Sequence, residues 1–426
     1  MENISFKIQG GQIPNGSVRI SGAKNAATRL MAAALISNED VLLENFPTRI
    51  VDAFHKANFI SNCGGEVLTN HDKETVLIKP EKLRDTLLGS YNYPIRTTYL
   101  LAAGLIKKSG SAKIPYPGGC KIGQRGYDLH IMVWEKLGAK VSEKPDFIEI
   151  FAPKGFSPGE INFPISTTGG TENALICAST IAGETVIRNA YISPEIENLI
   201  DFLRTLGAKI QVAGNSFIKV AGSDYLKGSI FPVIPDRIEA LTWIVYGALS
   251  GGSLTIKDVP FNAMQIPLIH LKEAGIDFFQ NQHNVKISPD CLLDGIIQPY
   301  EIATGTHPGV ISDMQAFYVL LALHADGISR VYDYRYPDRT KYLEELSKFY
   351  PGQLKWEKGK ITIIGKKNVT PVPENVRSTD LRGSMALVLA ALLAKGESTI
   401  ENVEMALRGY NNLESKLKSL GVSIKL

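Results

Sequence analysis

The chain has 426 residues, of which 44% are hydrophobic and 21% charged, and its formal net charge is +3. This size predicts two or more domains with large cores, and the balanced charge excludes the charge excess typical of nucleic-acid-binding proteins. The start, MENISFKIQGGQIP, lacks a signal-like apolar core, and no stretch reaches the roughly 18 apolar residues of a membrane helix. We therefore expect a soluble, cytoplasmic protein.

One pattern recurs in chain order: an Ala/Leu-rich helix, a turn with Gly, and a short β-branched strand. Its copies are NAATRLMAAALISNEDVLLENF (25–46), RTTYLLAAGLIKKSGSAKIPY (96–116), TENALICASTIAGETVIRNA (171–190), RIEALTWIVYGALSGGSLTIKDV (237–259), DMQAFYVLLALHADGISRVYD (313–333) and LRGSMALVLAALLAKGESTIENV (381–403). The copies follow one another at about 70 residues, longer than an ordinary solenoid repeat. Because these helices are nearly free of charge over three turns, we expect them to be buried on all sides.

A second signal repeats in phase with the first. It is a helix that ends in Gly and leads into a strand: CGGEV (63–67), LGAKV (137–141), LGAKI (206–210), AGIDF (274–278) and LGVSI (420–424). Gly after the last turn is typical of a left-handed C-cap. The two signals together predict six α/β units of the type strand, helix, strand, helix, strand, grouped three plus three in two domains.

Polar residues stand at the starts of the six apolar helices: Lys24–Asn25, Arg96, Thr167–Thr168–Gly169, Asp236–Arg237, Ser312–Asp313 and Asp380–Leu381–Arg382. Plain N-capping is one interpretation. It does not account for Lys24, Arg96 and Arg382, because a cation at a helix N-terminus opposes the helix dipole. Three such cations indicate an external anion.

The loops after the following strands add further cations. They carry Arg49, Cys120 with Arg125, Asp338–Arg339 and Arg408–Gly409–Tyr410. If the units are pseudo-symmetric, these loops fall on the same side of each domain as the helix starts. Arginine binds planar carboxylate and phosphate groups in a bidentate way. The expected ligand is therefore small and carries several negative charges.

The four cysteines, Cys63, Cys120, Cys177 and Cys291, are far apart and form no CxxC pair. A disulfide framework and a zinc site are not expected, and we predict neither a cofactor nor a metal. Cys120 is set apart by its surroundings, PYPGGCKIGQRGYDLH (115–130), where glycines and basic residues flank the thiol.

Six ordered motifs carry a resemblance to a known family: ISGAKNAA (20–27), PGGCKIGQRGYDLH (117–130), PDRIE (235–239), SDMQA (312–316), TDLRGS (379–384) and RGY (408–410). The chain resembles the UDP-N-acetylglucosamine enolpyruvyl transferases, whose superfamily includes 5-enolpyruvylshikimate 3-phosphate synthase. The resemblance implies a two-domain inside-out α/β barrel of six repeats, three per domain, with the buried helices inside. It implies one domain from residues 1–22 plus 235–426, and another from 23–234 that carries the Cys120 loop.

The resemblance also implies a reaction. The 3-hydroxyl of the GlcNAc unit adds to the central carbon of phosphoenolpyruvate, and phosphate then leaves, at an early step of peptidoglycan precursor synthesis. Cys120 matches the loop cysteine that acts as the acid and that the epoxide fosfomycin alkylates, and Asp313 matches the base near the sugar hydroxyl. A monomer is expected, with these two small molecules as its partners and no nucleic acid or membrane.

The remaining site residues also follow from the resemblance. Lys24, Arg125 and Arg408 match residues at the phosphate of phosphoenolpyruvate, with Lys24 among the catalytic set. Arg339 and Arg382 match the arginines near its carboxylate. The other matches are Asn25, Arg96 and Asp380, which position substrate or arrange the arginines; Asp128 and Leu129, on the nucleobase side; and Thr167, Thr168 and Gly169, at the UDP phosphates.

Several positions depart from the family pattern, mostly on the acceptor half. Gly126–Tyr127 stand where Pro and a variable residue are usual, Thr167–Thr168 where Ser-Val is usual, and Leu407 and Asn411 where Asp and Glu are frequent. Two alternatives therefore stay open: a paralogue that uses another nucleotide or nucleotide sugar, and a silent binding protein. The intact set of Cys120, Asp313 and cations argues against the silent protein.

Overall fold

The computed structural model describes residues 4–84, 95, 97–116 and 126–425. Within them the chain forms two compact units. The first unit combines the N-terminal segment up to Ser21 with the segment from Pro235 onward, and the second contains the described residues between Gly22 and Ile234. No helix of the described ranges combines the length and the apolar character needed to cross a bilayer.

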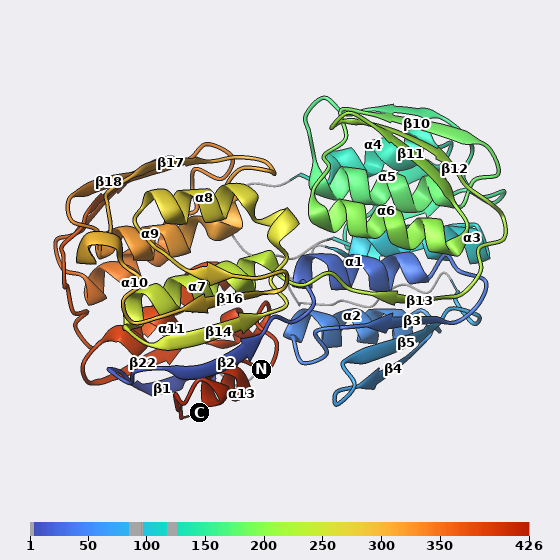
Figure 1. Ribbon diagram of the computed structural model, residues 1–426. Helices are drawn as coiled ribbons and strands as arrows, with labels where there is room; N and C mark the ends of the chain where they lie inside the picture. Colours follow the sequence, from blue (N-terminus) through green and yellow to red (C-terminus); the bar gives the residue numbers. More distant parts are fainter. Residues whose placement is uncertain (1–3, 85–94, 96, 117–125, 426) are drawn as a thin grey trace. The chain divides into compact units, whose positions relative to one another are not determined.

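The second unit contains three sheets and the helices of the N-terminal half (Figure 1). In order of pairing, the sheets are β13 (Ser229–Pro232), β3 (Val41–Glu44), β5 (Thr75–Lys79), β4 (Glu66–Asn70); β6 (Ser111–Pro115), β8 (Phe147–Phe151), β7 (Lys140–Glu143); and β11 (Lys209–Ala213), β12 (Phe217–Ala221), β10 (Glu184–Arg188), β9 (Glu160–Asn162). The helices are α1 (Lys24–Ala34), α2 (Val51–Asn62), the 3₁₀ helix η1 (Thr97–Leu101), α3 (Ala102–Ser109), α4 (Asp128–Lys136), α5 (Thr168–Ser179) and α6 (Pro194–Leu206).

The first unit also contains three sheets. They are β1 (Phe6–Gln9), β22 (Glu397–Glu401), β21 (Asn375–Arg377); β15 (Phe279–Gln280), β16 (Asn284–Ile287), β14 (Ser253–Lys257), β2 (Asn15–Arg19); and β17 (Glu301–Thr304), β18 (Ile328–Asp333), β20 (Lys360–Ile364), β19 (Leu354–Glu357). Its helices are α7 (Arg237–Ser250), α8 (Gln265–Glu273), α9 (Gln315–Leu323), α10 (Lys341–Phe349), α11 (Leu381–Leu393), α12 (Glu404–Leu407) and α13 (Leu413–Ser419), with short 3₁₀ helices at Phe261–Ala263, Leu293–Gly295 and Ser312–Met314.

The four-stranded sheets among those described share one pairing scheme, which the β17–β18–β20–β19 sheet shows well. β17 and β18 are parallel and are joined through α9, and β20 and β19 add antiparallel neighbours after α10. In the first unit two strands come from the N-terminus, because β1 pairs antiparallel with β22 and β2 pairs parallel with β14. The first 21 residues therefore belong to the unit built by the C-terminal half.

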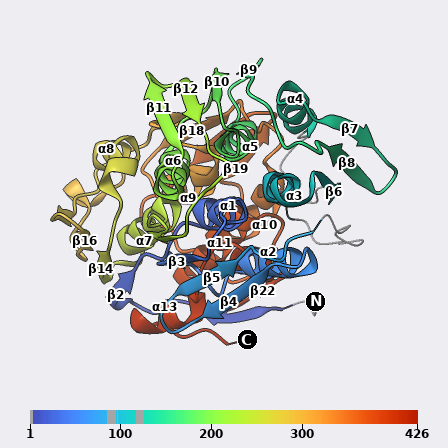
Figure 2. The ribbon, with the colours of Figure 1, turned by 90° about the vertical axis from the view of Figure 1, so that its right-hand side faces the viewer.

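The Ala/Leu-rich helices form the cores, as predicted. All of α9 is buried, and α11 is buried except at its last residue. Figure 2 looks along the helices of the second unit, with α1, α3 and α5 lying inside the strands of its three sheets. α9 carries no charged side chain, so its complete burial leaves no charge without a partner.

The predicted helix-ending glycines all adopt the left-handed conformation. Their φ values are positive at Gly64, Gly138, Gly207, Gly275 and Gly421. An L side chain rarely adopts this conformation, whereas Gly does so without steric strain. The α/β class is thus confirmed. The described strands form six open sheets, and no closed barrel occurs among them.

Candidate active site

Most of the predicted site residues fall into two groups, one in each unit, and we describe each group by itself. Cys120, Arg96 and Arg125 lie outside the described residues. The group in the first unit contains Asp313, Arg339, Asp380, Arg382 and Arg408. The group in the second unit contains Lys24, Asn25, Asp128, Leu129, Thr167, Thr168 and Gly169.

Arg339 is the centre of the group in the first unit. Its Nη1 donates to Asp313 Oδ1 at 2.9 Å and to the carbonyl oxygen of Ser312 at 2.9 Å, and its Nη2 donates to Asp380 Oδ1 at 3.1 Å. Burial by itself disfavours the cation, but Asp380 and Asp313 outweigh burial and raise the pKa of Arg339. The structure therefore brings these three predicted residues together.

Asp380 has two tasks in this arrangement. Its Oδ1 accepts hydrogen bonds from the backbone N–H groups of Arg382 and Gly383, each at 3.0 Å, which caps α11. The same oxygen accepts the Arg339 bond. N-capping and an arrangement of the arginines are thus compatible at this residue, because one carboxylate serves both.

Arg382 is almost completely buried, with 1% of its surface exposed, and none of its three side-chain nitrogens has a hydrogen-bond partner among the described residues. Its ion-pair distances are long, 3.6 Å to Asp313 Oδ2 and 3.7 Å to Asp236 Oδ2. The guanidinium lies over the ring of Tyr410, 5.3 Å from its centroid. A buried guanidinium whose donors are unsatisfied is unfavourable unless an anion completes it.

Two neighbours of Arg382, Asp236 and Tyr410, stand in the predicted motifs but were not assigned to the site. Asp236 caps α7 by accepting from the N–H groups of Ile238 at 2.8 Å and Glu239 at 3.2 Å. One hydrogen bond of 2.7 Å joins Tyr410 Oη and Thr242 Oγ1, and the tyrosine donates it because Thr242 donates its own proton to the carbonyl oxygen of Ile238. Both residues lie in quoted motifs, PDRIE and RGY, so their position in a motif was the available signal. Arg408, two residues before Tyr410, is also buried.

Lys24 is the first residue of α1 in the second unit, and its Nζ lies 3.2 Å from Asp52 Oδ2. Asp52 is buried in the first turn of α2. Asn25 follows Lys24 in the same turn. Asp52 was missed because an acid near a helix start resembles an ordinary complement to the helix dipole. An internal carboxylate therefore offsets the charge of Lys24, so Lys24 does not by itself indicate the external anion that the sequence predicted from its position.

The second unit holds further charged side chains, of which Glu172 and Lys56 are buried and Arg29 is half-buried. Arg29 Nε lies 3.0 Å from Glu172 Oε1, and Lys56 Nζ donates to the carbonyl oxygen of Thr97 at 2.5 Å. Burial lowers the pKa of Lys56 to about 7, with Arg29 adding to the shift and with Asp52 and Glu172 opposing it. The sequence signal that could have revealed the Arg29–Glu172 pair was a charged residue within each of two largely apolar helices, because charged residues are rarely buried without a partner.

The predicted acceptor-side residues lie at the starts of α4 and α5. Thr167 caps α5 by accepting from the N–H of Gly170 at 3.3 Å, and Thr168 and Gly169 form the first turn. Asp128 and Leu129 begin α4. The backbone amides of the first turn of α5 fit an anion, as helix N-termini do.

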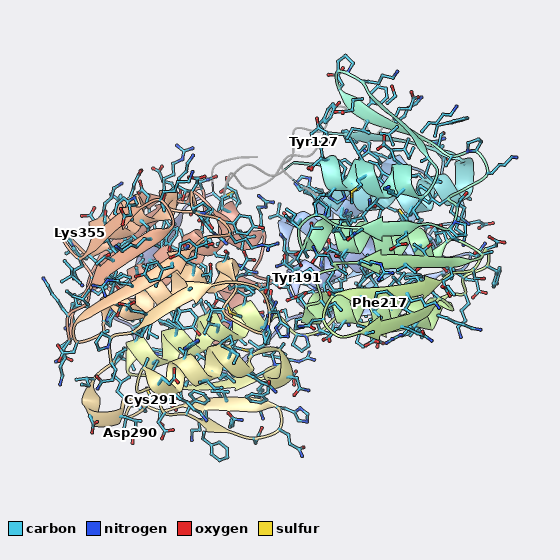
Figure 3. All side chains as sticks on the ribbon, turned by 90° about the horizontal axis from the view of Figure 1, so that it is seen from above. Tyr127, Tyr191, Phe217, Asp290, Cys291 and Lys355 are labelled. Carbon is cyan, nitrogen blue, oxygen red and sulfur yellow. The ribbon has the colours of Figure 1, made fainter. Side chains whose placement is uncertain are left out.

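The departures from the family pattern have local structural consequences. A Cβ at Gly126 would lie 2.3 Å from Asp128 Oδ1, so a larger residue there would displace the Asp128 side chain. Tyr127 Oη donates to Glu143 Oε2 at 2.8 Å, and Figure 3 labels Tyr127 at the start of α4. The buried Asn411 donates to Ser21 Oγ at 3.2 Å.

No group of three or more His, Cys, Asp or Glu side chains within the described ranges has the arrangement of a metal site.

The family model described as EPSP synthase (3-phosphoshikimate 1-carboxyvinyltransferase) matches residues 8–417.

The chain belongs to the EPSP synthase family. Within it, a UDP-N-acetylglucosamine 1-carboxyvinyltransferase of Koribacter versatilis is 36% identical, over 99% of this chain and 96% of its own. A protein of the same name from Afipia carboxidovorans is 35% identical, over 99% and 98%. The resemblance found in the sequence motifs is thus confirmed.

Two solved structures of EPSP synthase-like enzymes share the fold. The enolpyruvyl transferase NikO from Streptomyces tendae has a TM-score of 0.87 at 23% identity, over 99% of this chain and 98% of that chain. An EPSP synthase from Acinetobacter baumannii has a TM-score of 0.75 at 15% identity, over 99% of each chain. At these identities the similarity establishes the fold alone.

Proposed function

We propose that this chain transfers the enolpyruvyl group of phosphoenolpyruvate to the 3-hydroxyl of UDP-N-acetylglucosamine and releases phosphate, at an early step of peptidoglycan precursor synthesis. Full-length relatives that carry the name of this activity support the proposal. The names of these relatives state UDP-N-acetylglucosamine as the acceptor and give no support to the alternative acceptor. The structural observation that carries the proposal is the buried, hydrogen-bond-deficient guanidinium of Arg382 beside Arg339.

Arg382 and Arg339 suit the carboxylate of phosphoenolpyruvate. The planar guanidinium of Arg382 can donate two parallel hydrogen bonds to a carboxylate, which would satisfy donors that lack partners among the described residues. Arg339 is oriented by Asp313 and Asp380. Lys24, Arg125 and Arg408 are assigned to the phosphate.

We assign to Asp313 the role of the general base that accepts the proton of the sugar hydroxyl. Its side chain keeps 29% exposure, whereas Arg339 beside it keeps 4%. The ion pair at 2.9 Å favours the ionised carboxylate. In the addition step this carboxylate accepts the hydroxyl proton as the oxygen bonds to the central carbon, and Cys120 donates a proton to the methylene. In the elimination step the new methyl group returns a proton to the Cys120 thiolate, and the bond between the central carbon and the phosphate oxygen breaks. Phosphate leaves with that electron pair and takes up the proton held by Asp313, which restores the vinyl group and both side chains.

The acceptor is assigned to the second unit. Asp128 and Leu129 face the nucleobase in this proposal, and Thr167, Thr168 and Gly169 bind the diphosphate through the start of α5. Asn25, Arg96 and Asp380 position substrate or the arginines.

We also propose that the six sheets correspond to six pseudo-symmetric repeats of an inside-out α/β barrel fold, three per domain. The domain bounds proposed from the resemblance are 1–22 plus 235–426, and 23–234. A monomeric state and a cytoplasmic location are parts of the same proposal.

A phosphate-release assay tests the function. The purified chain is incubated with phosphoenolpyruvate and, in parallel, with UDP-N-acetylglucosamine, other UDP-sugars, UMP and no acceptor. We expect acceptor-dependent release with UDP-N-acetylglucosamine, and a product whose mass equals the acceptor plus the enolpyruvyl group. Release with a different nucleotide alone would establish a paralogue, and no release with any acceptor would contradict an enolpyruvyl transferase.

A further inference from the structure

Asp333 is a buried carboxylate that the proposed mechanism does not use. It is the last residue of β18, lies opposite Thr304 of the parallel strand β17, and is 2% exposed. Its Oδ2 accepts from Ser312 Oγ at 2.7 Å and from Gln315 Nε2 at 3.0 Å, and its Oδ1 accepts from the N–H of Tyr336 at 2.8 Å. Three donors from two segments, residues 312–315 and the loop at Tyr336, therefore converge on one side chain.

The first donor fixes the residue before Asp313. Ser312 has one hydroxyl proton, which it donates to Asp333, so its contact with Thr304 Oγ1 at 3.4 Å must be donated by the threonine. The carbonyl oxygen of Ser312 accepts from Arg339 Nη1, the nitrogen that also pairs with Asp313. The position of Ser312 thus determines where both members of the ion pair lie.

The other two donors fix the loop that carries Arg339. Asp333 Oδ1 holds the loop directly at Tyr336. On the far side of Arg339, Tyr342 Oη donates to Gln315 Oε1 at 2.9 Å, and Gln315 in turn donates to Asp333. Arg339 therefore lies between two points, Tyr336 and Tyr342, that are tied to the same carboxylate.

We propose that Asp333 is a positioning residue that sets the geometry of the Asp313–Arg339 pair during enolpyruvyl transfer, an inference that rests on the proposed function. All three of its partners present N–H or O–H groups, and only a carboxylate can accept from all of them. An asparagine would turn its NH₂ group toward at least one donor, whichever way its amide is oriented. The pair would then shift, and misplacement by about 1 Å can lower a rate by on the order of a hundredfold.

The test uses Asp333→Asn and compares turnover with acceptor binding. We expect kcat to fall roughly tenfold to a hundredfold, while the Kd for UDP-N-acetylglucosamine, measured by calorimetry, stays at the wild-type value. The matched control is Ser329→Ala. Ser329 is buried on the same strand and accepts a hydrogen bond from the N–H of Tyr300 at 3.1 Å, but it does not contact the pair. A kcat for Asp333→Asn equal to that of Ser329→Ala would overturn the inference.

A second variant keeps the test decisive if Asp333→Asn does not fold. Tyr342→Phe removes only the hydrogen bond to Gln315 and preserves the buried ring. We expect a smaller loss of kcat with unchanged acceptor binding, and wild-type turnover in Tyr342→Phe would contradict the positioning role. If the wild-type chain itself shows no transfer, the proposed function fails. If it is active and the variants match it, only the role of Asp333 fails.

Discussion

Lys56 Nζ donates a hydrogen bond of 2.5 Å to the carbonyl oxygen of Thr97 with none of the lysine exposed. One turn earlier on the same helix, Asp52 pairs with Lys24. Helix α2 therefore holds two other segments in place. Asp52 holds Lys24, and Lys56 holds Thr97 at the start of η1, which follows Arg96 in the sequence. Two proposed substrate-binding segments depend on this one buried helix face.

Lys56 makes stability depend on pH. The unfolded chain keeps the Lys56 proton up to its ordinary pKa of 10.5, whereas burial lowers the folded pKa to about 7. Between these values the unfolded state binds more protons, so the Lys56 contribution to the free energy of unfolding rises with pH. We expect the wild-type minus Lys56→Met difference to rise across this window, by at most about 1.4 kcal/mol per pH unit.

Urea unfolding at several pH values measures this difference. Lys82→Met, which removes an exposed lysine from the same unit, is the control. A Lys56→Met difference that stays parallel to that of Lys82→Met from pH 7 to 10 would show that Lys56 keeps its proton in the fold.

Arg382→Lys tests the carboxylate site. Lysine retains the charge but loses the planar pair of donors, so we expect the KM for phosphoenolpyruvate to rise by roughly tenfold or more, since a hydrogen bond between charged groups contributes about 1.5–3 kcal/mol. Arg377→Lys, on the exposed end of β21, is the matched control. Equal KM values for the two variants would show that Arg382 does not bind the carboxylate of phosphoenolpyruvate.

Asp313→Asn separates binding from chemistry. The amide keeps the shape of the side chain but cannot accept the hydroxyl proton, so we expect near wild-type binding of UDP-N-acetylglucosamine and a loss of roughly a hundredfold or more in turnover. Asp338→Asn changes an exposed aspartate beside Arg339 and should leave turnover intact. Turnover of Asp313→Asn within a few-fold of that control would exclude Asp313 as the base.

Fosfomycin should alkylate Cys120 and spare the other cysteines. Cys63, Cys177 and Cys291 are buried, and Figure 3 labels Cys291 beside Asp290. Burial raises the pKa of Cys63 to about 12 and that of Cys291 to about 11, and it raises that of Cys177 as well. A thiol reacts as its thiolate, so these three should be inert. Peptide mapping after incubation with fosfomycin identifies which cysteine carries the label.

The companion variant is Cys120→Asp. We expect it to retain transfer activity, because a carboxylic acid can also donate a proton, and to be insensitive to fosfomycin. Label on any buried cysteine, or loss of all activity in Cys120→Asp, would contradict the assigned role.

Local features of the fold could be predicted from the sequence. The left-handed glycines such as Gly207 and the caps at Asp236 and Asp380 depend on neighbours within a few residues, so a short pattern suffices to identify them. The buried helices follow from long charge-free runs. The Asp380 carboxylate was placed at a helix start by the same local pattern.

Pairs across long sequence distances could not be predicted in this way. Arg29 and Glu172 are 143 residues apart, and no local pattern connects them. Asp333 ends a strand with nothing to mark it, and its role appears only when Ser312, Gln315 and Tyr336 are seen around it. Polar networks of this kind are specified by tertiary contacts, which a single sequence does not display.

The pairing of β1 with β22 has a consequence for the order in which the chain is made. β1 is made long before β22, and the sheet that β1 completes cannot form until Glu397–Glu401 have been made. The described residues of the second unit lie between Gly22 and Ile234, and the last strand of that unit ends at Pro232. Domains generally fold as units during synthesis. The first unit therefore completes its fold after the second unit, and β1 lacks its partner strand β22 until residues 397–401 have been made.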